Sequence, residues 1–166
     1  NDHHKDFSFY FHVTEENKSS ILNIISENNL PNVDVISDEN IKLNILSKSI
    51  FAVSKSGTVS LQISNANIPS IIIYKLNPIN FFLFKLLANV KFANIINIIN
   101  NREVIPELLQ KECNAEEIYK TVIYFLNHPE LIKKQLIECN KTLEGIKSNT
   151  SSSDQSTAVL SSYLIS

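Results

Sequence analysis

The chain has 166 residues, of which 43% are hydrophobic and 19% charged, and its formal net charge is −2. This composition is typical of a globular protein with one substantial core, and it excludes a fibrous or fully disordered chain. The small negative charge indicates no general attraction to nucleic acid, so we predict no nucleic-acid partner.

Short apolar strands alternate with helical patterns over the first 74 residues. The aromatic segment FSFYFHV at residues 7–13 predicts a buried strand. The strands predicted after it span residues 33–36, 50–53 and 69–74, and the helices between them span residues 15–28, 41–47 and 58–65. This order favours an α/β fold with a doubly wound, Rossmann-like parallel sheet.

The rest of the chain reads as extra C-terminal helices. We predict helices at residues 78–88, 104–110, 115–126, 129–146 and 157–165. A polar run, SNTSSSDQS at residues 148–156, predicts a linker. The expected domains are therefore a Rossmann-like domain at 1–147, followed by a linker and C-terminal helix at 148–166.

The segment FAVSKSGTVSLQ at residues 51–62 places Ser56, Gly57 and Thr58 between a predicted strand and a predicted helix. Gly57 permits a sharp turn, and the free N–H groups of a helix start favour a phosphate or diphosphate. Ligands of open α/β sheets bind at the carboxyl ends of strands, which is where this loop lies. The alternative is a plain Ser/Thr helix cap. The Walker and GxGxxG fingerprints are both absent.

Two segments together resemble a known family. Residues 51–87 (FAVSKSGTVSLQISNANIPSIIIYKLNPINFFLFKLL) and the later INIINNREVIPELLQKEC resemble the lipid-A-disaccharide synthases. The resemblance runs from about Phe7 to Leu143. It implies the UDP-binding C-terminal half of a bacterial glycosyltransferase with two Rossmann-like domains, the GT-B fold. The SGT element is shared with other transferases of that fold, whereas its combination with NREVIPELLQKEC is more specific.

The resemblance also implies a reaction. The family transfers 2,3-diacylglucosamine from its UDP-linked donor to 2,3-diacylglucosamine 1-phosphate (lipid X), which forms the lipid A disaccharide and releases UDP. No metal or cofactor is expected. The acceptor site and the catalytic acid would belong to an N-terminal half, the partner of this half in the same enzyme. Since the chain has no Met and begins beside a predicted strand, we interpret it as part of a longer protein.

Site residues carry over position by position from the resemblance. The residues expected to bind the UDP-sugar are Ser56, Gly57, Thr58, Gln62, Asn97, Arg102, Glu107 and Gln110. The first three would face the diphosphate. Gln62 departs from the family, which usually has Glu there. In related transferases that carboxylate accepts hydrogen bonds from the ribose hydroxyls. No catalytic residue is expected within this chain.

Two alternatives remain beside the transferase half. One is a non-catalytic nucleotide-binding remnant, which Gln62 favours, and the other is half of a peptidoglycan-type N-acetylglucosamine transferase. Arg102 could instead form a salt bridge with Glu103 or Glu107. Lys42 and Lys55 are interpreted as surface charges, and the crowded Asp and His residues at positions 2–6 as a solvated terminus without a metal site.

The expected location is the cytoplasm. Two cysteines, Cys113 and Cys139, lie in helix-like stretches without a CxxC pair, and free thiols are usual in that compartment. The apolar residues 79–92 are too short to span a membrane. They predict either a buried helix or an interfacial helix that would bring the protein to the inner membrane peripherally.

Overall fold

The computed structural model describes residues 7–55, 57–77 and 91–149. The predicted helices at 78–88 and 157–165, residue Ser56 and most of the predicted linker lie outside these ranges. The chain divides into two compact units, Asn1–Ser49 and Ile50–Ser166. Both contain parallel strands and helices, which confirms the predicted α/β class.

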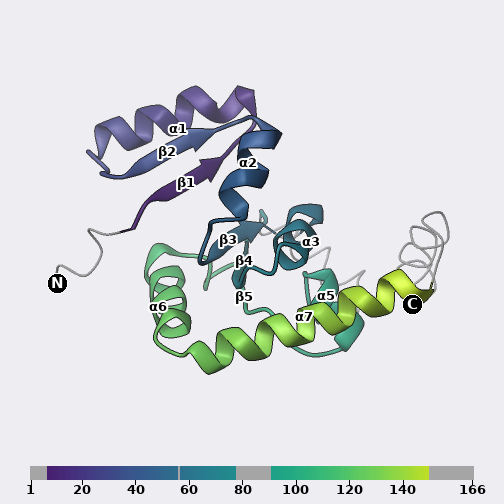
Figure 1. Cartoon of the computed structure of the whole chain (residues 1–166). Coiled ribbons are helices and arrows are strands. Elements are labelled where there is room, and N and C mark those ends of the chain that lie inside the picture. Colours follow the sequence, from purple (N-terminus) through teal and green to yellow (C-terminus); the bar gives the residue numbers. More distant parts are fainter. Residues whose placement is uncertain (1–6, 56, 78–90, 150–166) are drawn as a thin grey trace. The chain divides into compact units, whose positions relative to one another are not determined.

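The first unit has the order β1 (Phe9–His12), α1 (Glu15–Glu27), β2 (Val33–Ile36) and α2 (Glu39–Leu46). β1 and β2 pair in parallel, and α1 packs against β2 (Figure 1). The prediction of a buried strand at residues 7–13 is wrong in its burial, because Phe9, Tyr10 and Phe11 are 46–49% exposed. A two-stranded sheet with one helix against it has too few layers to enclose them.

Helix α2 begins two residues earlier than predicted. Asp38 accepts hydrogen bonds from the Asn40 and Ile41 amides and so fixes the helix start. Lys42 is only 5% exposed, so its prediction as a surface charge is wrong. Its ammonium pairs with the Glu39 carboxylate one turn earlier, which allows the aliphatic stem to be buried.

The second unit carries the larger sheet. Its elements in chain order are β3 (Ala52–Lys55), α3 (Thr58–Asn65), β4 (Ser70–Tyr74), α5 (Ile95–Asn100), β5 (Glu107–Leu109), α6 (Ala115–Leu126) and α7 (Pro129–Asn149). The strands lie in the order β3-β4-β5, and all pairings are parallel. The carboxyl ends of all three strands therefore lie at one edge of this sheet.

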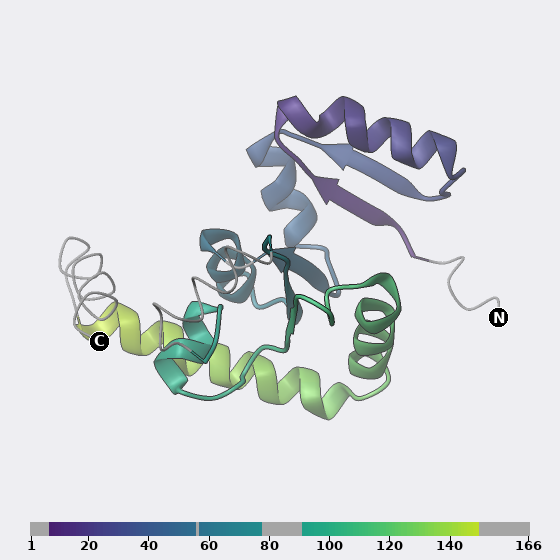
Figure 2. The same ribbon diagram turned by 180° about the vertical axis from the view of Figure 1, so that it is seen from behind.

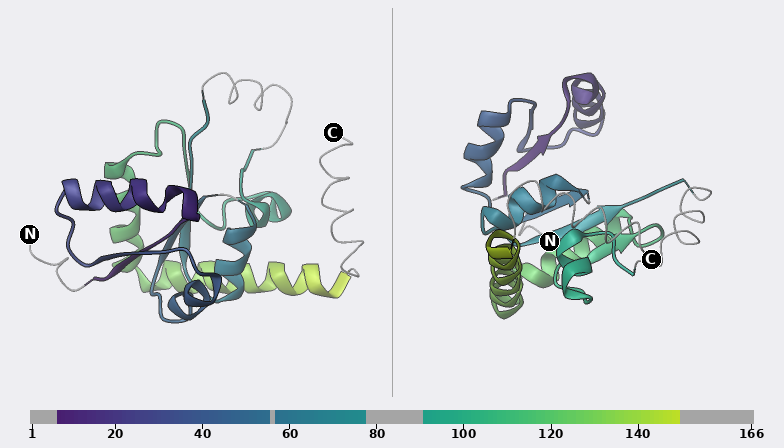
Figure 3. Two further views of the ribbon diagram at one scale, coloured as in Figure 1. Left: turned by 90° about the horizontal axis from the view of Figure 1, so that it is seen from above. Right: turned by 90° about the vertical axis from the view of Figure 1, so that its right-hand side faces the viewer.

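Helix α7 packs against α3, α5 and α6 (Figures 1 and 2), and Figure 3 views it nearly end-on in its right panel. The buried cluster of the unit consists of Ile72, Ile96, Ile105 and Cys139, which come from four different segments. Gln135 of α7 fixes the amino end of β4, because its side chain accepts from the Ser70 amide and donates to the Ser70 carbonyl.

The prediction of a helix at residues 104–110 is wrong. Residues 107–109 form β5, paired in register with residues 72–74 of β4, and the Ile72 amide donates to the Pro106 carbonyl. A short helix, α5, lies upstream instead. Its start is fixed by the Asn94 side chain, which accepts from the Ile96 amide, so a cap overrides the weak helix propensity of the Ile-rich run IINIIN.

The two cysteines are free and differ in accessibility. Cys139 of α7 is 2% exposed, and burial raises the pKa of its thiol. Cys113 is partly exposed. It lies before α6, so the prediction that it lies in a helix is wrong.

We expect iodoacetamide to modify Cys113 at least about tenfold faster than Cys139 in the folded chain, because the reactive species is an accessible thiolate. Mass spectrometry of timed samples measures both rates, and denaturant should bring them together. Equal rates without denaturant would contradict the burial of Cys139.

Candidate functional site

The predicted diphosphate loop lies at the carboxyl edge of the second unit's sheet. Gly57 and Thr58 follow β3, Leu76 follows β4, and Gln110 follows β5. Because these strands are parallel neighbours, the loops that carry these residues leave the sheet at the same edge. Ser56, predicted to belong to the loop, lies outside the described residues.

Gly57 sets the geometry of the loop. Its φ is +135° and its ψ −163°, a conformation that residues with a side chain rarely adopt. Gly57 is the N-cap of α3 and has no side chain to cap the helix, so the N-cap residue itself is neither Ser nor Thr. A Cβ added at Gly57 would meet nothing within 4 Å, so the backbone borders open space.

Thr58 and Gln62, one turn apart on α3, are both exposed. The first N–H groups of a helix have no partner within the helix and carry partial positive charge. The start of α3 therefore offers donors to an anion, and Gln62 is placed one turn further along the same helix.

Lys55 is the last residue of β3, directly before the loop. Its ammonium lies 5.3 Å from the ring centroid of Tyr74, the last residue of β4, as in a cation–π contact. The sequence had suggested only a surface charge. Lys55 is exposed, but the structure holds its charge at the edge that carries Gly57.

Gln110 joins two loops at the same edge. Its Oε1 accepts from the Leu76 amide at 2.6 Å, and its Nε2 donates to the Leu76 carbonyl at 3.1 Å. Gln110 itself has a φ of 50°, in the left-handed region. The side chain thus holds the segment after β4 against the segment after β5.

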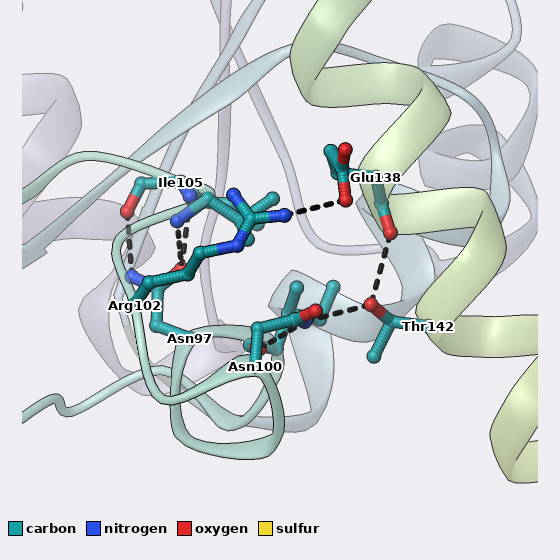
Figure 4. A network of polar contacts seen from close by, with 8 residues as sticks. Asn97, Asn100, Arg102, Ile105, Glu138 and Thr142 are labelled. Atoms are coloured by element: carbon teal, nitrogen blue, oxygen red, sulfur yellow. Dashed lines mark hydrogen bonds and ion pairs between the residues drawn. The ribbon is translucent and has the colours of Figure 1, made fainter.

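Asn97 is fully buried at 0% exposure. Its Oδ1 accepts from the Val104 and Ile105 amides at 2.7 and 2.9 Å, and its Nδ2 donates to the Ile105 carbonyl at 2.7 Å (Figure 4). Nδ2 also donates to Glu107 Oε1 at 2.7 Å. Asn97 thus organises the loop that leads into β5, and all four of its bonds are made to the protein.

Glu107, the first residue of β5, is 8% exposed. Its two carboxylate oxygens accept from the Ala93 and Asn94 amides at 2.7 and 2.9 Å, besides the bond from Asn97. The negative charge therefore lies at the start of α5, where the helix dipole stabilises it. These contacts explain how a carboxylate is kept in a buried position.

The Arg102 amide donates to the Asn97 carbonyl at 3.2 Å, but the Arg102 side chain bonds elsewhere. It pairs with Glu138 of α7 at 2.6 Å, and Asn100 beside it bonds Thr142 of the same helix at 2.7 Å (Figure 4). The partner is neither Glu103 nor Glu107, the two alternatives that the sequence suggested. Arg102 precedes β5 and borders a cavity of about 220 Å³ together with Gln135, which binds the amino end of β4. This is the edge opposite to the Gly57 loop.

Two residues that were not predicted from the sequence, Ser60 and Asn94, link the loop to the network around Glu107. Ser60 and Asn94 are both 0% exposed, and Asn94 Nδ2 donates to Ser60 Oγ at 2.9 Å. A cap signal could have identified Asn94, because it precedes an apolar helical run. The Ser60 hydroxyl falls at the third position of α3, where nothing in the local sequence distinguishes it from an ordinary helix serine.

The same unit carries the segments that resemble a known family, SGTVSLQ and NREVIPELLQKEC. Comparison with family models matches residues 1–160 to the family described as lipid-A-disaccharide synthetase. The chain belongs to this family.

Curated relatives agree with this membership. The chain is similar to the lipid-A-disaccharide synthase of Rickettsia bellii (strain OSU 85-389), with 39% identity over 65% of the chain and 29% of the relative. It is similar to that of Rickettsia prowazekii (strain Madrid E), with 31% identity over 90% of the chain and 40% of the relative. It is also similar to that of Persephonella marina (strain DSM 14350 / EX-H1), with 28% identity over 86% of the chain and 38% of the relative. The matched region thus spans well under half of each relative's length.

Within residues 7–55, 57–77 and 91–149, no three His, Cys, Asp or Glu side chains come together as a metal site would require. No helix in the described part of the chain is long and apolar enough to cross a membrane.

Proposed function

We propose that this chain is the nucleotide-sugar-binding part of a glycosyltransferase that makes the lipid A disaccharide. Its donor would be UDP-2,3-diacylglucosamine, and its acceptor 2,3-diacylglucosamine 1-phosphate. Family membership supports the reaction class, because the family and the relatives carry the name of this activity. The substrates follow from the resemblance of the SGT and NREVIPELLQ segments.

The observation that carries the proposal is the backbone at Gly57. A residue at φ +135° opens α3 at the carboxyl edge of a parallel sheet, with open space above its Cα. This arrangement brings the N–H groups of a helix start within reach of a diphosphate. Lys55 adds a positive charge at the same edge.

In the proposed reaction, a hydroxyl of the acceptor attacks the anomeric carbon of the donor sugar. The bond from that carbon to the diphosphate oxygen breaks, and the electron pair leaves with UDP. Charge develops on the departing diphosphate, and donors placed beforehand at the Gly57 loop would stabilise it. The acceptor site would lie in an N-terminal half, across a cleft from this part. The catalytic acidic residue of that half would take the proton of the attacking hydroxyl as its carboxylate.

Eight residues remain our proposed donor-site set. Ser56, Gly57 and Thr58 would face the diphosphate, and Gln62 the ribose. Asn97, Glu107 and Gln110 would act by holding the loops around the donor, since their side chains bind the protein backbone. Arg102 would act from the amino edge through Glu138. We retain residues 1–147 as the proposed UDP-binding domain and residues 148–166 as linker and C-terminal helix.

Titration of the chain with UDP tests the proposal. Calorimetry or ligand-observed magnetic resonance should detect weak binding of UDP, and ADP at the same concentrations serves as the control for base recognition. Binding of neither nucleotide would overturn the proposal. Binding of both with equal affinity would leave a diphosphate site without the uridine specificity that the transferase requires.

Gln62→Glu is expected to tighten UDP binding about fivefold. A charge-assisted hydrogen bond to a ribose hydroxyl exceeds a neutral one by about 1 kcal/mol. Asn127→Asp, at an exposed position after α6, adds the same charge elsewhere and should leave the affinity unchanged. Unchanged or weaker binding by Gln62→Glu would show that position 62 does not face the ribose.

Gln62 also favours a second candidate, a nucleotide-binding protein without transferase activity. This candidate predicts UDP binding but no disaccharide formation, even when an N-terminal half of the family is supplied in trans. Formation of the disaccharide by that mixture, measured from UDP-linked donor and lipid X, would exclude it.

A further inference from the structure

Two buried hydrogen bonds and one partly buried hydrogen bond connect Glu107, through Asn94 and Ser60, to the backbone of Gly57. The Asn94 amide donates to Glu107 Oε1 at 2.9 Å, and Asn94 Nδ2 donates to Ser60 Oγ at 2.9 Å. Ser60 Oγ in turn donates to the Gly57 carbonyl at 2.7 Å. Four segments of the second unit therefore meet in this chain: β5, the residue before α5, the first turn of α3, and the loop after β3.

The direction of each bond is determined. The Ser60 hydroxyl has one hydrogen, which it gives to Gly57, and it accepts the Asn94 hydrogen with a lone pair. The Asn94 oxygen is already used, since it accepts from the Ile96 amide at 2.9 Å. Asn94 can therefore only donate to Ser60, and Ser60 can only donate onward to Gly57.

The Gly57 carbonyl receives two bonds from the same residue. The Ser60 amide donates to it at 3.1 Å, in addition to the hydroxyl at 2.7 Å. Because a trans peptide unit is planar, fixing the Gly57 C=O also fixes the opposite direction of the Thr58 N–H. The Thr58 N–H belongs to the helix start that would face the diphosphate.

We propose that Ser60 and Asn94 are positioning residues of the donor site, which set the orientation of the Gly57–Thr58 peptide toward the donor diphosphate. This inference rests on the proposed function. Neither residue would touch the ligand, because both are fully buried.

The fold by itself does not require this pair. An alanine at position 60 would keep α3 helical, and a serine at position 94 could still cap α5. Burying a hydroxyl and an amide side chain is unfavourable unless both are hydrogen-bonded. What the pair adds is a connection from the Glu107 carboxylate to the Gly57–Thr58 peptide, which belongs to the proposed diphosphate loop.

Ser60→Ala provides the main test. We expect this variant of the 166-residue chain to bind UDP about fivefold more weakly, because the loop loses its fixed orientation. The Gly57 and Thr58 amide resonances of the free chain should also shift, as ¹⁵N–¹H correlation spectra would show.

Asn94→Ser provides a second variant, with an oxygen to cap α5 but too short a side chain to reach Ser60. It should weaken UDP binding to a similar degree. The double variant should bind no more weakly than either single variant, because both act through one hydrogen-bonded chain. Additive losses would overturn the linked mechanism.

Gln135→Leu is the matched control. Gln135 is 4% exposed and makes two buried bonds to Ser70 at the amino end of β4, away from the loop. Its loss should lower the melting temperature and leave the UDP affinity and the Thr58 amide resonance unchanged. An equal loss of affinity in Gln135→Leu would show that Ser60 and Asn94 act only through general stability.

The outcomes separate this inference from the proposed function. Failure of the unaltered chain to bind UDP would overturn the proposed function and this inference with it. Normal UDP binding by the unaltered chain, Ser60→Ala and Asn94→Ser alike would overturn the positioning role alone. If Asn94→Ser does not fold, Ser60→Ala and its amide spectra still decide the question.

Discussion

Gly57→Val is expected to abolish UDP binding by the chain. At φ +135° a valine is strained, because its branched side chain clashes with the local backbone in this region. The strain is relieved only if the loop changes conformation, which would turn the Thr58 N–H away from the donor. The Cβ would enter open space, so the fold should tolerate the change better than the site does.

The chain offers a matched control, because it contains only one other glycine, Gly145 in α7. Gly145→Val makes the same substitution in helical backbone, and a Cβ there also meets nothing within 4 Å. It should retain UDP binding. Calorimetry measures both variants, and undiminished binding by Gly57→Val would place the UDP site elsewhere.

Asn97→Ala is expected to lower the free energy of unfolding by about 3–5 kcal/mol. The change leaves the Val104 and Ile105 amides, the Ile105 carbonyl and one bond of the Glu107 carboxylate unsatisfied in a buried site. A buried donor or acceptor without a partner costs about 1–3 kcal/mol, and the costs of linked groups do not add fully. Urea unfolding followed by circular dichroism provides the measurement.

Asn100→Ala serves as the comparison from the same helix. Asn100 is partly buried and donates to the Ile96 carbonyl and to Thr142. Its loss should cost about 1 kcal/mol, since water can replace part of these bonds. Equal destabilisation by the two variants would contradict the central position of Asn97 (Figure 4).

The two effects separate the roles of the predicted site residues. Gly57→Val should act on UDP binding with a modest effect on stability, whereas Asn97→Ala should act on stability first. A variant of Asn97 that retained full stability but lost UDP binding would instead support direct contact between this side chain and the donor.

The sequence by itself determined the α/β class, the strands β1 to β4, and the helices α1, α2, α3, α6 and α7, within a few residues at each end. These elements have strong local patterns: β-branched runs for the strands, and caps such as Asn114 for a helix with a clear apolar face. It also placed Gly57 at a turn before a helix, because only two glycines occur in the chain and one falls there.

Only the tertiary structure decided the state of residues 104–110, which resemble a helix locally but include β5, since residues 107–109 pair with β4. Hydrogen bonds to a neighbouring strand can outweigh a local helix propensity. The sequence of the segment itself does not indicate which strand will pair with it. Likewise, Asn97, Glu107 and Gln110 were recognisable as polar family positions, but their partners lie up to 34 residues away. The link from Asn94 through Ser60 to Gly57 spans 37 positions of sequence, so only the tertiary structure, which brings the residue before α5 to the first turn of α3, could reveal it.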